Sequence, residues 1–179
     1  MFKKVCIIGC GLIGSSIARA IKKNNLSTKI VSSNRSDTTN KKVIKLNIVN
    51  DSSSDTKKMV EESDLIIIAT PLSSYKSLIF KIKNSLKNGA ILTDVGSVKE
   101  KAISLIEKNI PKNVSWISSH PIAGTEESGP EAGFSELFKD RWCIITPSSQ
   151  AKKRDIKLLR NFWKKIGSRV DIMDAKQHD

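Results

Sequence analysis

Three glycines near the start of the chain separate a short apolar segment from an amphipathic one. Gly9, Gly11 and Gly14 have the spacing Gly-x-Gly-x-x-Gly, and residues 4–8 before them read Lys-Val-Cys-Ile-Ile. Apolar residues then recur at the spacing of one helix face, at Ile13, Ile17, Ala20 and Ile21. A strand, a glycine turn and a helix in this order are typical of a dinucleotide site. The alternative is a glycine-rich turn that only changes the direction of the chain.

In the dinucleotide interpretation each glycine has its own task. Gly9 makes the tight turn, Gly11 lets the backbone approach the pyrophosphate, and Gly14 lets the helix pack closely on the strand. The helix then points its unsatisfied N–H groups at the phosphates. The first-turn residues Leu12 and Ile13 complete this part of the predicted cofactor site.

Predicted strands and helices alternate along the rest of the chain. The strands are predicted at 29–33, 48–49, 65–69, 90–94, 114–118, 142–145 and 170–173, and the helices at 41–46, 54–62, 73–85, 99–110 and 151–166. Residues 65–69 are apolar on both faces, as a central parallel strand is. The alternation predicts an α/β fold, with a doubly wound, mainly parallel, Rossmann-like sheet and helices on both faces. We expect residues 1–173 to form one dinucleotide-binding domain.

Charge and cysteine content restrict the class of protein. The 179 residues carry a net charge of +13, but lysines occur in nearly every predicted helix. We interpret them as a solvated coat that attracts anionic small molecules, and the alternative is a nucleic-acid surface.

The chain has three cysteines, Cys6, Cys10 and Cys143. Their odd number and the lack of Cys-x-x-Cys spacing argue against a disulfide framework and against a zinc site. Cys6 and Cys143 are expected in the core. Apolar runs are too short for a membrane span or a signal peptide, so we expect a cytoplasmic protein.

The end of the second predicted strand bears on the choice of cofactor. Enzymes that use NAD usually have an acidic residue at this point, which holds the ribose 2′-OH. This chain has Asn34, Arg35 and Ser36 instead. Asn34 does not repel a 2′-phosphate, and Arg35 can pair with one bidentately. The segment therefore favours NADP, and the alternative is NAD beside a turn with a solvated Arg35.

Other strand ends supply further candidates, because ligands of such folds bind at the carboxyl ends of the strands. Thr70 and Pro71 follow the most apolar predicted strand and are expected beside the nicotinamide ribose. Val95 and Gly96 follow the next strand and are also assigned to the cofactor site. Ser97 places a hydroxyl near the reacting ring, or alternatively caps the next helix.

His120 is the candidate general base. It is predicted just past the strand at 114–118, on the ligand side of the sheet. A neutral imidazole there can take the proton from an alcohol as hydride leaves the same carbon. Pro121 stiffens the loop after it. The alternative is a loop histidine held by backbone hydrogen bonds. The other histidine, His178, is interpreted as a tail residue.

Several segments together resemble the prephenate and arogenate dehydrogenases of tyrosine biosynthesis. The matching segments are 9–16, 94–99, 119–126, 129–134 and 141–144. The most specific is Ser-His-Pro-Ile-Ala-Gly-Thr-Glu at 119–126, and the similarity extends over essentially the whole chain. The resemblance implies oxidative decarboxylation of prephenate or arogenate with NADP or NAD as the cofactor.

The resemblance also implies roles for individual residues. His120 accepts the proton of the ring C4 hydroxyl while hydride passes from C4 to the nicotinamide. Carbon dioxide then leaves C1, and aromatisation drives the reaction. Ser97 hydrogen-bonds the same hydroxyl and helps to orient His120. Gly124 and Thr125 are assigned to substrate binding, and no metal is implied.

The chain departs from the family pattern at two places. Asn34 stands where the family usually has an acidic residue. The family also continues into a helical C-terminal domain that dimerises and supplies an Arg for the substrate carboxylate, whereas this chain ends at Asp179. We therefore expect residues 174–179 to begin a connection to that domain. The expected result is a complete nucleotide site, an incomplete substrate site, and a homodimer only when the C-terminal domain is present.

Two other functions stay open at this stage. One is a different NADP-dependent reductase of the β-hydroxyacid or pyrroline-carboxylate kind, which would suit Asn34 and Arg35. The segment 119–126 argues against it. The other is a non-catalytic nucleotide-binding module, against which His120 and Ser97 argue.

Overall fold

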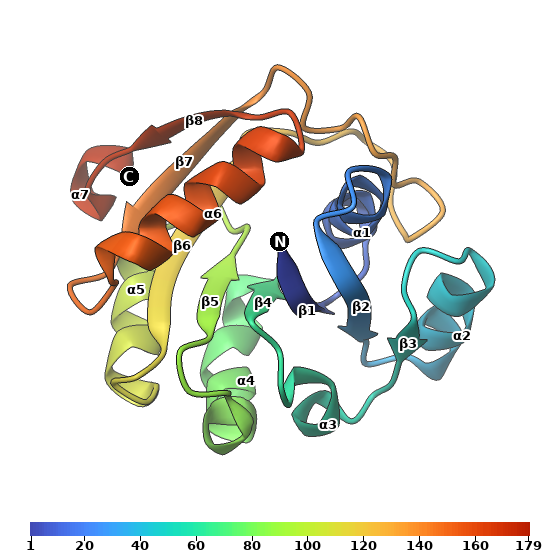
Figure 1. Ribbon diagram of the computed structural model, residues 1–179, viewed down its shortest axis with the longest axis horizontal. Helices are drawn as coiled ribbons and strands as arrows, with labels where there is room; N and C mark the ends of the chain where they lie inside the picture. The colour runs from blue at the N-terminus through green and yellow to red at the C-terminus, as the bar shows by residue number, and fades with distance from the viewer.

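Eight strands form one sheet in the computed structural model, which describes residues 1–179 (Figure 1). The strands are β1 (Phe2–Ile8), β2 (Ser27–Ser33), β3 (Asp51–Ser52), β4 (Leu65–Ile68), β5 (Ile91–Asp94), β6 (Ser115–Pro121), β7 (Trp142–Pro147) and β8 (Arg169–Ile172). Their order is β3-β2-β1-β4-β5-β6-β7-β8, so β3 and β8 are the two edges. Only β6 and β7 pair antiparallel. The predicted doubly wound, mainly parallel fold is confirmed.

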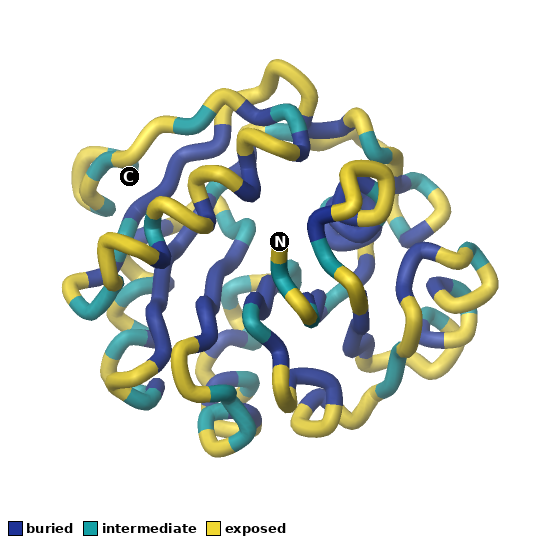
Figure 2. Tube along the Cα trace, in the orientation of Figure 1, coloured by how far each residue is buried: buried dark blue, intermediate teal, exposed yellow.

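Helices cover both faces of this sheet. They are α1 (Leu12–Lys23), α2 (Asp37–Lys45), α3 (Thr56–Val60), α4 (Tyr75–Ile82), α5 (Glu100–Ile106), α6 (Lys153–Lys165) and α7 (Ala175–His178), with 3₁₀ turns η1 (Leu72–Ser74), η2 (Lys83–Ser85) and η3 (Glu107–Asn109). In β4, Leu65 and Ile67 belong to the apolar cluster beneath α1 and α6. Ile66 and Ile68 belong to the cluster beneath α3, α4 and α5. The central strands are buried and the outer helix surfaces exposed (Figure 2), so residues 65–68 form the predicted central strand.

The third strand begins later than the prediction at 48–49. It is the polar pair Asp51–Ser52, while residues 48–49 are buried in the core without joining the sheet. Asn47 has a left-handed φ of 54° where the chain leaves α2, and pairing with β2 starts only after that turn. The prediction was wrong because this edge strand is held by polar contacts. One is the 2.7 Å contact between the hydroxyls of Ser32 and Ser52, which leaves no apolar pattern in the sequence.

The sixth strand is longer than predicted and includes His120. Its parallel partner β5 pairs with it only as far as Trp116. The antiparallel strand β7 pairs with the rest and sets His120 opposite Ile144. His120 therefore lies within the strand. The prediction that it lies in the loop after the strand was wrong. Pairing with a strand so far along the chain cannot be recognised from the local pattern.

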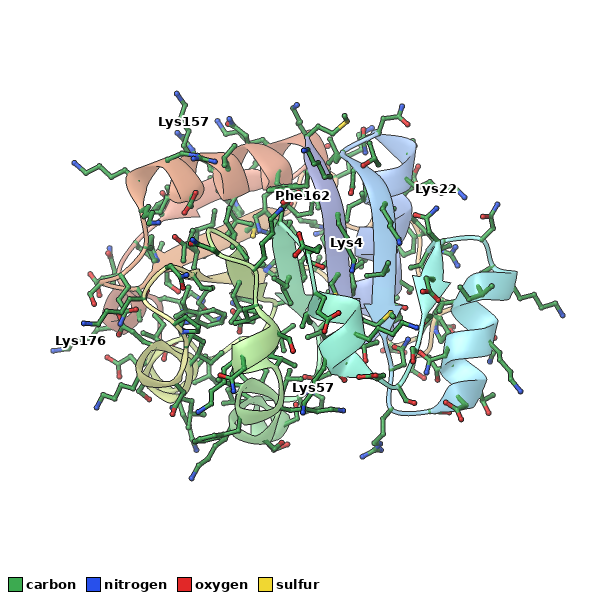
Figure 3. The ribbon with its side chains drawn as sticks, turned by 60° about the horizontal axis from the view of Figure 1, so that its bottom comes forward. Lys4, Lys22, Lys57, Lys157, Phe162 and Lys176 are labelled. Carbon is green, nitrogen blue, oxygen red and sulfur yellow. The ribbon has the colours of Figure 1, made fainter.

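Lysine side chains project from several sides of the molecule (Figure 3). The labelled examples are Lys22 on α1, Lys57 on α3, Lys157 on α6 and Lys176 on α7. Their distribution agrees with a solvated coat. The three cysteines are buried and unpaired, which confirms Cys6 and Cys143 as core residues. None of the helices has the length and apolar character that crossing a membrane requires.

Candidate functional site

A polar cavity lies at the carboxyl ends of β1, β2 and β4, with a volume of about 630 Å³. Such a volume falls within the range of about 300–1,000 Å³ that is usual for small-molecule and cofactor sites. Six predicted cofactor residues line it: Gly9, Gly11, Asn34, Arg35, Ser36 and Thr70. The other predicted cofactor residues, Leu12, Ile13, Gly14, Pro71, Val95 and Gly96, are not among its lining residues.

The glycine turn has the geometry that the sequence predicts. Gly9 has a φ of +93°, and a Cβ atom on it would lie 2.8 Å from the carbonyl oxygen of Ala69. A Cβ on Gly14 would lie 2.0 Å from the carbonyl oxygen of Gly9, so only glycine lets α1 pack against the turn. Gly11 borders open space and precedes α1 without a side-chain cap. The first N–H groups of α1 are therefore available to an anion in the cavity.

Asn34 faces inward and supports the glycine turn. Its side-chain oxygen accepts a hydrogen bond from the backbone N–H of Cys10 at 2.6 Å, and its amide nitrogen donates to Asn40 at 3.0 Å. Asn34 is 7% exposed. These bonds occupy its polar atoms, whereas Arg35 beside it is exposed. Arg35 therefore provides the free charge at this strand end.

Lys81 is a cavity residue that the sequence analysis misses. It lies on α4, lines the cavity that Arg35 also lines, and donates a hydrogen bond from Nζ to Thr56 Oγ1 at 3.3 Å. Two cations from distant parts of the chain thus face one polar cavity. No local pattern distinguishes Lys81 from the other lysines of the predicted helices, so only the fold identifies it.

A second cavity, of about 640 Å³, lies at the carboxyl ends of β5 and β6. Its lining residues are Ser97, Val98, His120, Ile122, Ile144, Met173, His178 and Asp179. Ser97 and His120 therefore meet at one cavity, but no hydrogen bond joins them. Gly124 and Thr125 are exposed in the loop after β6 and do not line it.

His120 makes its side-chain hydrogen bond with the other histidine of the chain. Its Nδ1 lies 2.9 Å from Nε2 of His178, which comes from α7. The sequence alone predicts a tail residue at His178, and the contact with His120 arises only from the packing of α7. Asp174, whose side chain accepts a hydrogen bond from the N–H of Gln177, is a recognisable helix N-cap. That signal could have predicted α7, but not where α7 packs.

A buried ion pair lies close to His120. The Nζ of Lys99 donates to both carboxylate oxygens of Asp94, at 3.1 and 3.0 Å, and to the carbonyl oxygen of Ser119 at 2.8 Å. Both side chains are fully buried. Asp94 also accepts hydrogen bonds from Tyr75 at 2.9 Å and from Ser118 at 2.5 Å. The pair ties the ends of β5 and β6 together just before His120.

Burial and the neighbouring Lys99 keep the imidazole of His120 neutral. Desolvation lowers its pKa from the ordinary value of 6.5, and the positive charge of Lys99 and the proximity of His178 lower it further. The ring is therefore a proton acceptor at neutral pH. Together the two cavities offer a site for a nucleotide and a base at the same edge of the sheet.

Comparisons with known proteins place these features in one family. The family model described as "Prephenate dehydrogenase, nucleotide-binding domain" matches residues 17–172. The cyclohexadienyl dehydrogenase of Zymomonas mobilis is 35% identical over 179 residues, which cover 100% of this chain and 61% of that protein. The prephenate dehydrogenase of Bacillus subtilis is 31% identical, over 98% of this chain and 47% of that protein.

Solved structures give the same result. The prephenate dehydrogenase of Aquifex aeolicus, crystallised with hydroxyphenyl propionate and NAD+, superposes with a TM-score of 0.91 at 26% identity. The match covers 99% of this chain and 62% of that one. This chain thus spans between about half and three-fifths of the length of these relatives. Because the family model covers most of the chain, the chain belongs to the prephenate dehydrogenase family, of which it contains the nucleotide-binding domain.

Proposed function

We propose that the protein is an NAD(P)-dependent dehydrogenase of tyrosine biosynthesis, which oxidises and decarboxylates prephenate or arogenate. The observation that carries this proposal is the half-buried, neutral His120 at the wall of a cavity that Ser97 also lines. Membership of the family supports it, since the relatives named above are prephenate and cyclohexadienyl dehydrogenases.

The residues of the first cavity fit a nicotinamide dinucleotide. The open space at Gly11 and the uncapped start of α1 suit a pyrophosphate, and Thr70 borders the same cavity. When bound, this cofactor supplies the hydride acceptor of the reaction. Pro71, Val95 and Gly96 are proposed to complete its site toward the second cavity.

His120 and Ser97 are proposed to act on the hydroxyl at ring C4. With Nδ1 hydrogen-bonded to His178, the Nε2 atom of His120 is the nitrogen left to take the hydroxyl proton. The oxygen–hydrogen bond then breaks as C4 is oxidised, and loss of carbon dioxide from C1 makes the ring aromatic. Ser97 is proposed to hold the same hydroxyl in place, and Gly124 and Thr125, in the loop after β6, are proposed to bind the substrate.

The cofactor is proposed to be NADP in preference to NAD. No acidic side chain lines the first cavity, whereas the exposed Arg35 and Lys81 line it with positive charge. A 2′-phosphate carries negative charge that an arginine can pair bidentately.

Replacing Arg35 with Ala is expected to weaken NADP binding roughly tenfold to a hundredfold, because a hydrogen bond to a charged group contributes about 1.5–3 kcal/mol. The affinity for NAD is expected to change little. Calorimetric titration of both cofactors tests this, with Arg160→Ala as the matched control, since Arg160 is an exposed arginine on α6. A clear preference for NAD that Arg35→Ala leaves unchanged would contradict the NADP assignment.

The organisation of the whole protein is also part of the proposal. Residues 1–173 are the dinucleotide-binding domain, and residues 174–179 begin the connection to a helical domain that completes the substrate site and forms a homodimer. The greater length of the relatives supports this. We further propose a cytoplasmic enzyme whose lysines serve solubility and the attraction of anionic small molecules, without a nucleic-acid or membrane partner.

A further inference from the structure

A histidine and a carboxylate from α7 and its C-cap extend the hydrogen bonding of His120. His178 Nε2 lies 2.9 Å from His120 Nδ1, and His178 Nδ1 lies 2.8 Å from Asp179 Oδ1. The two imidazole rings meet edge to face, with centroids 5.1 Å apart. Only 9% of the His178 side chain is exposed. A carboxylate and two imidazoles therefore form one continuous series that ends at the cavity of His120.

Asp179 is held as an ionised acceptor at one end of this series. Its carboxylate accepts hydrogen bonds of 2.9 Å from the backbone N–H groups of Lys99 and Glu100, at the start of α5. Burial alone would raise the pKa of Asp179, but the bonds from Glu100 and Lys99 and the contact with His178 outweigh it, so the pKa is lowered. An ionised carboxylate has no proton to donate, so in its contact with His178 it accepts the hydrogen bond and Nδ1–H of His178 donates it.

We propose that His178 and Asp179 are positioning residues that set the tautomer of His120, an inference that rests on the proposed role of His120 as the base. Asp179 accepts a hydrogen bond from Nδ1–H of His178, which leaves the lone pair of His178 on Nε2. That lone pair accepts Nδ1–H of His120. Neutral His120 then keeps its own lone pair on Nε2, the nitrogen outside the series. A carboxylate fixes the tautomer of a catalytic histidine by the same logic in Ser-His-Asp triads.

This arrangement prepares His120 for one proton transfer. The oxygen–hydrogen bond of the substrate hydroxyl breaks and a nitrogen–hydrogen bond forms at Nε2, while the protons on Nδ1 of both rings stay in place. Charged groups around His120 act in both directions on its pKa. The charge of Lys99 disfavours the protonated imidazole, whereas the charges of Asp94 and Asp179 favour it. His178 adds an acceptor at Nδ1, which holds the imidazolium once it has formed.

The tautomers can be observed directly in the native chain by nitrogen-15 NMR of the imidazole rings, at about pH 8, which lies well above the ordinary histidine pKa of about 6.5. The chain has only 2 histidines, so the spectrum contains the signals of two imidazole rings. The signals that disappear in His178→Gln belong to His178, and the remaining ones to His120. Both histidines are expected to carry the proton on Nδ1. A His120 that carries its proton mainly on Nε2 would overturn the proposal without any variant being needed.

Asp179→Asn gives the sharpest change. The backbone N–H groups of Lys99 and Glu100 keep the amide oxygen of the asparagine, because they cannot change their role. The amide NH2 group then faces His178 and donates where the carboxylate accepted, so it reverses the tautomer of His178 and through it that of His120. We expect the proton of His120 to move to Nε2. In His178→Gln, the side-chain oxygen can still accept Nδ1–H of His120, so the native tautomer is expected to persist. Gln177→Ala, an exposed neighbour on α7, is the control and is expected to leave both rings unchanged.

Turnover is measured in a form that carries the C-terminal part of the longer relatives. Asp179→Asn is expected to lower kcat at least about tenfold with little change in KM, because the base nitrogen is then blocked. His178→Gln is expected to retain more activity than His178→Leu. Equal losses in these two variants, or a tautomer of His120 that Asp179→Asn does not move, would overturn the positioning role.

The outcome separates this inference from the proposed function. Normal turnover of His120→Asn, together with the expected tautomers, would contradict the role of His120 as the base and leave the hydrogen-bonded series intact. Loss of turnover in His120→Asn, together with a His120 that carries its proton on Nε2 in the native chain, would contradict only the role of His178 and Asp179.

Discussion

Replacing His120 with Asn will lower kcat by roughly 10²–10⁴-fold, the usual contribution of a well-placed general base. Asn keeps a polar side chain of similar reach but cannot take up a proton at neutral pH. The affinity for the dinucleotide is expected to stay nearly the same, because His120 lines the second cavity and not the first. The comparison is made by steady-state kinetics in a form that carries the C-terminal part of the longer relatives, with cofactor titration alongside.

The pH profile gives an independent check on the same residue. Only neutral His120 accepts the proton, so the native rate falls as the pH drops through its pKa. Desolvation and Lys99 put that pKa below the ordinary value of 6.5. The acid limb of the profile therefore lies below about pH 6.5, and it disappears in His120→Asn. Near-normal kcat with an unchanged acid limb would make His120 a structural residue only.

Replacing Lys99 with Met will destabilise the fold by about 3–5 kcal/mol, the usual cost of removing one partner of a buried ion pair. Asp94 would keep two hydroxyl donors, Tyr75 and Ser118, but lose its only cation. Its carboxylate is fully buried, so water cannot replace the lost charge. Urea unfolding followed by circular dichroism measures the change.

Two further variants show whether the effect comes from the unpaired charge. Lys101→Met, at an exposed position on α5, is expected to stay within about 0.5 kcal/mol of the native chain. The double variant Asp94→Asn with Lys99→Met is expected to recover part of the loss, because no charge is then buried alone. A Lys99→Met variant as stable as Lys101→Met would rule out this account of the pair.

Features encoded in consecutive residues could be predicted from the sequence. The glycine turn is one, since Gly9 has a left-handed φ of +93° and a Cβ on Gly14 would meet the carbonyl oxygen of Gly9 within the same turn. The strand at 65–68 is another, because burial on both faces leaves an uninterrupted apolar run. The helix α2 was predicted only in its second half, because residues 37–40 contain no apolar side chain that would show the helical spacing. The local signal for its start is the N-cap Ser36, whose hydroxyl accepts from the N–H of Thr39.

Features created by distant packing could not be predicted in the same way. Lys81 lines the first cavity because α4 lies beside the polar turn after β2, and His178 reaches His120 because β7, β8 and α7 fold back onto β6. Neither residue differs in its local sequence from an ordinary solvated side chain. Asn34 shows the opposite case, since its position was predicted but its amide is engaged with Cys10 and Asn40 in place of a ligand.

The two edge strands determine whether the sheet of one molecule can pair with a strand of another copy of the chain. An unpaired strand edge offers free N–H and C=O groups on which another chain can add a strand and begin aggregation. Here β3 has only 2 residues, too few to align a partner. The other edge, β8, alternates the charged Arg169 and Asp171 with apolar residues, so an added strand would have to accommodate both charges. The net charge of +13 also repels copies of the chain from one another, so strand addition at β8 would be opposed both by the edge charges and by the overall charge.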